Sequence, residues 1–258
     1  MKDYIVFTVA GNHYAIEVAS IERIVQTPPI TAIPNAHPYI DGMMSYERRV
    51  TKVVNFRKMT DLPTHEAELI AVFTQVKQEH EVWEKALRDA IMNGTEFHLT
   101  TDPHGCRLGK WLDHFSTHDS DILAILKQLR SVHSRLHELG KELLLLCQKD
   151  SEAAKEMLKQ EMGTVFENTI RSLDKMISAC GTISGHSQKM LIYRNGENLF
   201  AIKVDTIEDM TSIDASMMKE VDSANRFEEF LETSGVVEMD EKLVNVIKSV
   251  SLPVRKGL

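Results

Sequence analysis

The sequence predicts an α+β protein in which a helical domain is inserted into a β-rich domain. Three observations support this: the spacing of apolar residues becomes helical near residue 66 and strand-like again near residue 186, the two flanks share a pattern, and histidines interrupt the apolar faces of the helices. A chain of 258 residues has room for one large domain or two ordinary ones. We therefore expect a first β-rich part over residues 1–65, a helical insert over residues 66–180 and a second β-rich part over residues 186–258.

The composition is that of a soluble globular protein, with 43% hydrophobic and 26% charged residues. A net charge of −8 argues against binding to nucleic acid or to an anionic membrane surface, since both attract lysine and arginine. Three widely spaced cysteines favour a reducing compartment over a disulfide scaffold. We find no signal-peptide pattern and no apolar run long enough to span a membrane, and therefore expect a cytoplasmic protein.

The first β-rich part begins with a predicted hairpin. Tyr4–Val9 and Tyr14–Val18 are short apolar or alternating runs on either side of Gly11-Asn12, a pair typical of tight turns. The prolines of Thr27–Pro34 keep that segment extended, because each disfavours the helical region for the residue before it. Val50–Phe56 is a further strand candidate.

The insert is predicted to contain four amphipathic helices joined by short connections, which suggests a bundle. The first helix ends at Asn93-Gly94, a typical C-terminal cap, and a short helix follows over Leu108–Phe115. Asp119 or Ser120 begins the third helix, and Asp150-Ser151 begins the fourth. The apolar stripe of the first helix comprises Leu69, Val72, Phe73, Val76, His80, Trp83, Leu87 and Ile91, and that of the third comprises Ile122, Leu126, Leu129, His133, Leu136 and Leu143.

Three histidines on predicted buried faces need a chemical explanation. His80 lies on the first helix, and His133 and His137 lie one turn apart on the third. A buried imidazole is unfavourable unless its nitrogens are satisfied, and a bond to a backbone carbonyl is the simplest way to satisfy one. Three such histidines together with Cys106, at the start of the short helix, instead predict a metal site in the bundle core. Three imidazoles and a thiolate are ligands that suit tetrahedral zinc.

A site with four protein ligands argues against hydrolysis, because catalytic zinc keeps one position open for water. His133-Ser-Arg-Leu-His137 also lacks the glutamate of metalloprotease helices. A zinc-bound Cys106 thiolate near a helix start would stay deprotonated, and its oxidation would remove a ligand, so Cys106 is either a redox sensor or a purely structural ligand. Cys147 and Cys180 are interpreted as core residues. The remaining histidines of this region are interpreted as surface residues, with His104 the one competitor for a ligand position: His98, His104, His114 and His118.

The second β-rich part repeats the first. Met190–Tyr193 and Leu199–Val204 flank Asn195-Gly196 and predict another hairpin. Three stretches correspond between the flanks: Phe7–Val18 with Leu191–Val204, Ile21–Ile24 with Ile207–Met210, and Glu47–Val54 with Asp240–Ile247. Each unit is too short for a large core, so two small barrels would share one.

Two family resemblances emerge from these residues. The flanks resemble a CheW-like domain, the adaptor module of bacterial chemotaxis, through Phe7 to Arg57, with Gly11, Tyr14-Ala-Ile, Pro28-Pro-Ile, Ile33-Pro34, Tyr39-Ile-Asp-Gly42 and Val53-Val-Asn-Phe-Arg57. The insert resembles the chemoreceptor zinc-binding (CZB) domain through His80…Trp83, Cys106-x-x-Gly-Lys-Trp-Leu112 and His133-x-x-x-His137.

The resemblance implies a pair of SH3-like five-stranded β-barrels with an inserted zinc-binding four-helix bundle, whose ligands are His80, Cys106, His133 and His137. It implies a non-enzymatic signalling adaptor that couples chemoreceptors to a CheA-type histidine kinase and senses zinc, or oxidants such as hypochlorous acid. It also implies a homodimer through the bundle. One departure stands out: where the family has an Asn-Leu-Arg-Gly-like turn, this chain has Ser45-Tyr-Glu-Arg48, which puts the standard receptor contacts in question.

Two other function classes remain open. A zinc-buffering protein could have kept the adaptor fold without receptor coupling, which an empty receptor or kinase pull-down would favour. A metalloenzyme would need a labile fourth ligand, so that zinc stays bound when Cys106 or His104 is replaced. We rank the enzyme last, because no nucleophile–base pair or phosphate-binding glycine loop is visible in the sequence.

Overall fold

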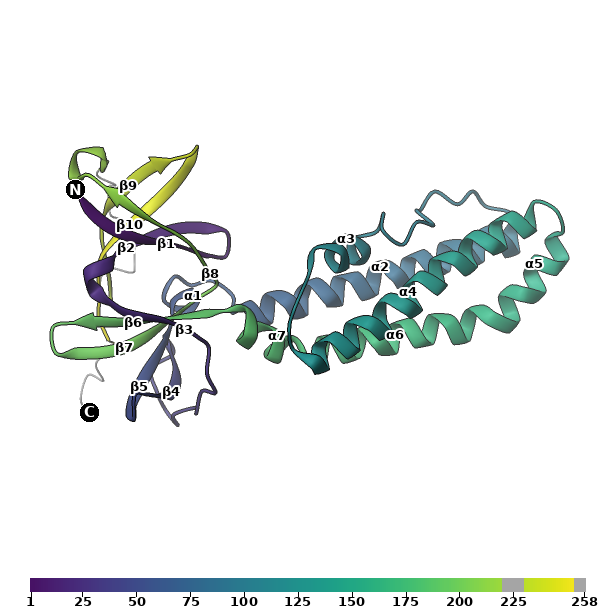
Figure 1. Cartoon of the computed structure of the whole chain (residues 1–258). Coiled ribbons are helices and arrows are strands. Elements are labelled where there is room, and N and C mark those ends of the chain that lie inside the picture. The colour runs from purple at the N-terminus through teal and green to yellow at the C-terminus, as the bar shows by residue number, and fades with distance from the viewer. Residues whose placement is uncertain (220–229, 253–258) are drawn as a thin grey trace. The chain divides into compact units, whose positions relative to one another are not determined.

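The computed structural model describes residues 1–219 and 230–252, and the chain divides into two compact units (Figure 1). The first unit is formed by Met1–His65 together with Ser184–Leu258, and the second by Glu66–Ile183. Both flanks therefore fold into one unit, which is interrupted by the other.

The first unit is built from β-strands with three short helical turns. The turns are Val18–Ser20, α1 (Phe56–Met59) and Ala215–Met217. Its described strands are β1 (Lys2–Val9), β2 (Asn12–Glu17), β3 (Ile21–Gln26), β4 (Ile40–Tyr46), β5 (Arg49–Asn55), β6 (Lys189–Asn195), β7 (Asn198–Val204), β8 (Thr206–Ile213), β9 (Leu231–Met239) and β10 (Lys242–Val250). Sequence patterning did not predict β4 or β9 as strands, because a glycine interrupts each of them.

The strands form two five-stranded sheets in which the flanks are interleaved. One sheet has the order β8-β1-β2-β10-β9 and the other β3-β6-β7-β5-β4. Each takes a hairpin from one flank and three strands from the other, and each contains one parallel pair, β2 with β10 and β5 with β7. Strands that correspond in the sequence repeat thus occupy equivalent positions in the two sheets. In each sheet, the hairpin of one repeat is completed by three strands of the other repeat. Neither flank can complete a sheet without the other.

Alternating residues of the central strands serve two cores, as the period of two in a strand requires. In β1, Ile5 and Phe7 join a large apolar cluster that draws on both sheets, whereas Tyr4 and Val6 join a smaller cluster within their own sheet. The other sheet has an equivalent small cluster that includes Met44, Val53, Met190, Ile192 and Ala201. Burial on both faces explains why these strands are almost continuously apolar in sequence.

The hairpins β4–β5 and β9–β10 turn in the same way. Each turn is made by two consecutive charged residues in the left-handed region: Glu47 and Arg48 have φ of 47° and 63°, and Asp240 and Glu241 have φ of 46° and 63°. This is the geometry of the tight turn that matches strand twist. The residue pair that departs from the CheW-like pattern therefore lies at the tip of a well-formed hairpin.

A buried ion pair lies where the chain leaves and re-enters the first unit. Arg57 Nε lies 2.9 Å from Asp205 Oδ1, and Arg57 Nη1 donates to the carbonyl of Pro63, just before the helical unit begins. Gln188, just after that unit ends, donates to Asp205 Oδ1 at 2.9 Å, and the backbone N–H of Ala10 donates to Asp205 Oδ2 at 2.8 Å. One carboxylate thus connects the departing and returning segments.

The second unit is helical and is built around two long helices. Its helices are α2 (His65–Asn93), α3 (Arg107–His114), α4 (Ser120–Cys147), α5 (Ser151–Met157), η2 (Leu158–Met162) and α6 (Gly163–Ser178). A last helix, α7 (Cys180–Ser187), begins in this unit and ends in the first. Of the two caps that the sequence offers for α4, Asp119 and Ser120, the structure uses Asp119, and Asp150 caps α5. The predicted fourth helix instead consists of α5 and α6 with a π-helical turn between them, and α7 crosses the predicted gap after residue 180. No helix in the described part of the chain combines the length and apolarity that a membrane crossing requires.

Candidate metal centre

The site lies in a polar layer between two apolar clusters of the helical unit. Along α2, the residues of one cluster end at Val76 and those of the other begin at Trp83, with His80 between them. Along α4, the last buried residue of the first cluster is Leu129, and the first buried residue of the second cluster is Leu136. His133 and His137 lie at this same boundary, and all three histidines are buried. A layer of imidazoles thus replaces the apolar contacts that would otherwise join the two clusters.

Cys106 completes the group from the start of α3. It is the N-cap residue, and its sulfur accepts the backbone N–H of Gly109 at 3.3 Å. Cys106 Sγ lies 3.2 Å from His133 Nε2 and 4.0 Å from His80 Nε2. One donor atom from each of His80, Cys106, His133 and His137 lies within 4.8 Å of the others. Donor atoms around tetrahedral zinc lie roughly 3.4–3.7 Å apart, so the group is close to the size of a zinc site.

Unsatisfied ring nitrogens indicate that the group fits a metal rather than a set of core histidines. Neither Nδ1 nor Nε2 of His137 has a hydrogen-bond partner, although both are buried. His80 Nδ1 lies 2.8 Å from the Val76 carbonyl, which places the proton on Nδ1 and leaves Nε2 with a lone pair facing Cys106. The backbone-bonded alternative therefore accounts for one nitrogen of His80. At His137 the Thr100 carbonyl lies close enough to raise the pKa of the ring, but neither ring nitrogen makes a hydrogen bond of ordinary geometry.

The pKa values of the four side chains also indicate that the group fits a metal. Burial lowers the pKa of His133 to about 3, with His137 and His80 lowering it further, and burial lowers the pKa of His137 to about 4. Burial also lowers the pKa of His80. The three imidazoles are therefore neutral at pH 7, the form that binds metals. Burial raises the pKa of the Cys106 thiol despite the N–H groups of Gly109 and Leu108, so a cation is needed to hold the thiolate.

Two glycines of the helical unit are explained by close contacts around the site. A side chain at Gly109 would collide with the carbonyl of Pro103, which explains the glycine in the Cys-x-x-Gly motif. A side chain at Gly140 would collide with the ring of Trp83. Trp83 itself contacts the His137 ring, with centroids 4.9 Å apart, and its Nε1 donates to the carbonyl of Thr100 at 2.8 Å. Sequence reasoning missed Thr100 and Gly140, because their importance arises from contacts between distant segments.

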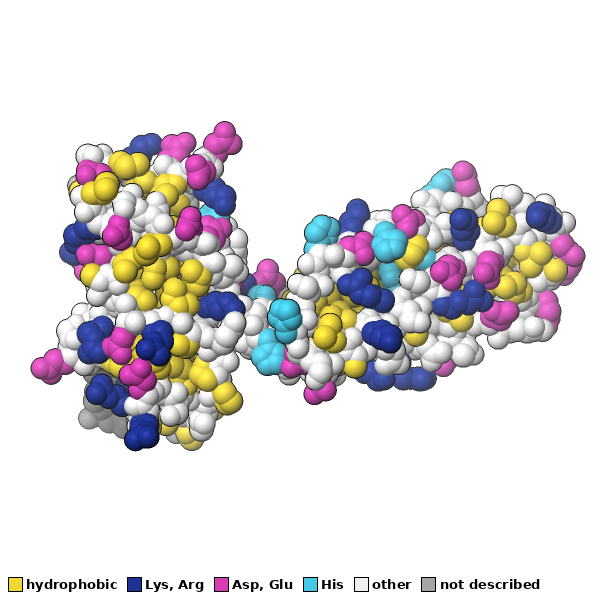
Figure 2. Space-filling model, viewed as in Figure 1, with side chains coloured by type: hydrophobic (Ala, Val, Ile, Leu, Met, Phe, Trp, Pro, Cys, Tyr) yellow, Lys and Arg dark blue, Asp and Glu magenta, His cyan; other side chains and the backbone are white. Residues whose placement is uncertain are grey.

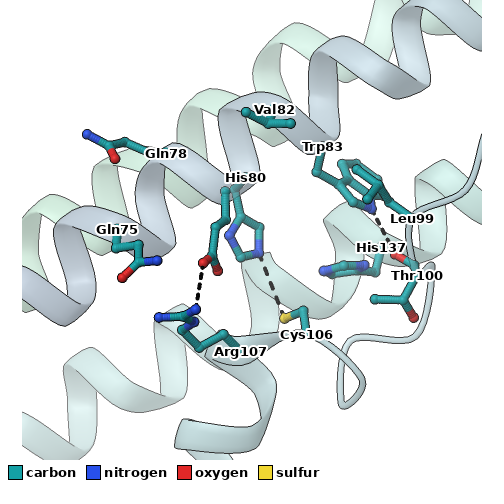
Figure 3. Close-up of a pocket in the computed structure, with 11 residues that line it drawn as sticks. Gln75, Gln78, His80, Val82, Trp83, Leu99, Thr100, Cys106, Arg107 and His137 are labelled. Carbon is teal, nitrogen blue, oxygen red and sulfur yellow. Dashed lines mark hydrogen bonds and ion pairs between the residues drawn. The ribbon is translucent and has the colours of Figure 1, made fainter.

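A cavity of about 440 Å³ opens beside the group (Figure 3). His80, Cys106 and His137 line it, together with apolar side chains that include Trp83 and Leu99. Cys106 is only partly buried, unlike the three histidines. The sulfur is therefore the member of the group that a small molecule in the cavity would reach.

The other sequence candidates lie outside this group. His104 is exposed and pairs with Asp113, with His104 Nδ1 2.9 Å from Asp113 Oδ2, so the structure does not bring it to the site. His98, His114 and His118 are also exposed, and Figure 2 shows several surface histidines on the helical unit. Cys180 is buried and Cys147 is half-buried, and neither joins the group.

Two family models match the chain between residues 3 and 144. Residues 3–83 match the CheW-like domain, and residues 80–144 match the chemoreceptor zinc-binding domain. The chain is 39% identical over 62 residues to the chemotaxis protein CheW of Bacillus subtilis (strain 168), covering 24% of this chain and 40% of the relative. It is 38% identical over 48 residues to the diguanylate cyclase DgcZ of Escherichia coli (strain K12), covering 17% of this chain and 16% of the relative. The chain thus spans less than half of the length of either curated relative.

Two solved structures are also similar. The scaffolding protein TtCheW from Thermoanaerobacter tengcongensis matches with a TM-score of 0.44 and 10% identity, covering 96% of this chain and 84% of that one. The regulatory CZB domain of DgcZ matches with a TM-score of 0.38 and 16% identity, covering 45% of this chain and 98% of that one. From the family matches we conclude that the chain combines a CheW-like domain with a chemoreceptor zinc-binding domain.

Proposed function

We propose that this protein is a cytoplasmic adaptor that couples chemoreceptors to a CheA-type histidine kinase, and that its helical insert adjusts this coupling in response to zinc or to oxidants such as hypochlorous acid. The observation that carries the proposal is the buried group of His80, Cys106, His133 and His137, set within a unit whose two ends continue into the CheW-like unit. The proposed role is regulatory, not catalytic.

The four side chains would hold one zinc ion with every ligand supplied by the protein. Bound zinc would keep the Cys106 thiolate deprotonated and join α2, α3 and α4. Four protein ligands leave no coordination position for a substrate, which is why we prefer a structural and sensory role to hydrolysis.

The signal would be a change in the order of the helical unit. Without zinc, buried ring nitrogens such as those of His137 lack partners, and each unsatisfied group costs about 1–3 kcal/mol. Oxidation of Cys106 would remove one ligand and have a similar effect. The segments that leave and re-enter the β-rich unit meet at Asp205, so a change of order in the insert could reach the partner-binding unit through them.

Three further assignments belong to this proposal. The two five-stranded sheets would be the SH3-like barrels of an adaptor, and the helices over residues 66–180 would be a four-helix bundle. The bundle would also mediate a homodimer, which sedimentation of the zinc-bound and zinc-free protein tests directly. A monomer under both conditions would remove dimerisation from the proposal.

A zinc-buffering protein without receptor coupling is the second candidate, and the turn at Glu47 and Arg48 favours it. Glu47 occupies the position of the family's arginine, and its carboxylate lies 3.6 Å from Arg23 Nη2. With Arg48 beside it, this carboxylate leaves the hairpin tip without the net positive charge of the family's Arg-Gly pair.

The decisive experiment measures zinc content and partner binding together. Untagged wild-type protein, Cys106→Ala and His133→Ala are analysed for zinc per chain, and binding to a CheA-type kinase and to receptor cytoplasmic domains is measured with and without zinc. We expect about one zinc per chain in the wild type, less in both variants, and partner affinity that depends on zinc. Equal partner affinity with and without zinc would refute the sensory role, and no partner binding at all would favour the buffer.

A further inference from the structure

The four candidate ligands are enclosed on most sides. Along the bundle, the two apolar clusters described above close the polar layer at either end. On the side of His133, α6 closes the layer, because Thr169 is fully buried there and its hydroxyl donates to the carbonyl of Val132 at 3.2 Å. A metal ion that crossed these contacts would have to lose its water shell in an apolar environment, which is strongly unfavourable.

In the described part of the chain, the cavity beside Cys106 opens the remaining side of the layer. His80, Cys106 and His137 line it, whereas His133 lies behind them. Its volume of about 440 Å³ exceeds the roughly 200 Å³ that zinc with a full water shell occupies at about 30 Å³ per water. A hydrated ion therefore fits beside three of the four side chains.

Exposure separates the floor of this cavity from its mouth. Trp83, on the floor, is 4% exposed, whereas Leu99 and Val82 are 43% and 63% exposed (Figure 3). Val82 lies on α2 and Leu99 on the segment between α2 and α3, so these two elements form the mouth. Glu79 and Arg107 also line the cavity, with Arg107 Nη2 3.2 Å from Glu79 Oε1, and as a pair they add no net charge to it.

We propose that this cavity is the route by which zinc enters and leaves the site, and that Val82 and Leu99 at its mouth set the rate of exchange. This rests on the proposed function only in taking the four side chains as zinc ligands. Neither aliphatic side chain can bind the metal, so their size should change how fast zinc moves but not how tightly it is held. A barrier on a route that entry and release share changes both rates by the same factor and cancels from the Kd. The mouth would thus set how quickly the site follows a change in zinc.

The test measures entry and release separately on the full-length protein. Cobalt, which takes tetrahedral sites and absorbs visible light when bound to a thiolate, is mixed with metal-free protein to follow entry, and excess EDTA is then added to follow release. Release of zinc itself is followed with the chromophoric chelator 4-(2-pyridylazo)resorcinol. We expect Leu99→Trp to slow entry and release about 10-fold each, and Val82→Ala with Leu99→Ala to speed both about 3-fold, while the Kd changes by less than about 2-fold.

Leu123 provides the matched control, because it is 47% exposed on α4 and does not line this cavity. Leu123→Trp and Leu123→Ala should leave both rates at the wild-type value. Should Leu99→Trp disturb the fold and change the Kd, the double alanine variant decides, because faster entry and faster release at an unchanged Kd require an opened route.

Wild-type rates in the cavity variants, or rates that change in the double alanine variant only together with the Kd, would overturn the proposal while leaving zinc-dependent partner binding untouched. Conversely, the cavity variants would still change both rates if partner binding proved independent of zinc. A wild type that binds neither metal would overturn both the route and the proposed function.

Discussion

Replacing His137 by leucine should have opposite effects on stability with and without zinc. His137 is fully buried, and neither of its ring nitrogens has a hydrogen-bond partner. Leucine removes these polar atoms at roughly similar volume, so the metal-free helical unit should become more stable. Two unsatisfied atoms at about 1–3 kcal/mol each set the upper limit, and the lost contact with Trp83 reduces the gain, which leaves about 1–2 kcal/mol.

Zinc should make the wild type more stable than the variant, the reverse of the metal-free result. A free zinc concentration 1,000-fold above the wild-type Kd stabilises the folded wild type by about 4 kcal/mol. If the loss of one ligand weakens binding about 100-fold, the variant gains only about 1.4 kcal/mol under the same conditions. The wild type should then be the more stable protein by about 1 kcal/mol.

The assay is urea unfolding in EDTA and in buffered zinc, followed by tryptophan fluorescence. Both tryptophans, Trp83 and Trp111, lie in the helical unit, so this signal reports that unit alone. His104→Leu is the matched control, because His104 is exposed outside the group and should change stability by less than about 0.5 kcal/mol in either condition. A less stable variant in EDTA would mean that His137 is a satisfied core residue. Full zinc stabilisation of the variant would mean that His137 is not a ligand.

Three further predictions follow from the structure. Gly109→Ala should weaken zinc binding at least 10-fold in a zinc titration, because the new methyl group collides with the Pro103 carbonyl, whereas Gly163→Ala, where the added methyl meets nothing, should not. Asp205→Asn should destabilise the β-rich unit by about 3 kcal/mol at pH 7, since it leaves Arg57 without its carboxylate. Burial raises the pKa of Asp205, but bonds from Arg57 and Ala10 outweigh it and leave the pKa lowered. The stability that the ionised Asp205 contributes to the wild type is therefore present above about pH 4 and lost in acid. The difference between wild type and Asp205→Asn should therefore shrink as the pH falls, which hydrogen exchange of the strand amides of that unit measures; a constant difference would refute the argument. Glu47→Arg with Arg48→Gly should increase receptor binding at least 10-fold in a pull-down titration, whereas the equivalent change of Asp240 and Glu241 in the β9–β10 turn should not.

Local patterns determined much of the fold. The hairpins at Gly11 and Gly196 follow from turn residues between β-branched runs, and the helices follow from apolar stripes between caps such as Asp119 and Asp150. The candidate ligands could also be predicted, because a histidine on an apolar helical face has few explanations. The position of His80 three residues before Trp83 already placed it in the core.

Contacts between distant residues could be decided only by the tertiary structure. The exchange of strands between the flanks depends on pairings such as β2 with β10, whose residues lie more than 200 positions apart and leave no local signal. The same applies to the ion pair of Arg57 with Asp205 and to that of Glu79 with Arg107. The sequence alone identified which side chains could bind zinc. The structure alone revealed that they separate two apolar clusters, that the nitrogens of His137 make no hydrogen bond of ordinary geometry, and that a cavity leads to the sulfur of Cys106.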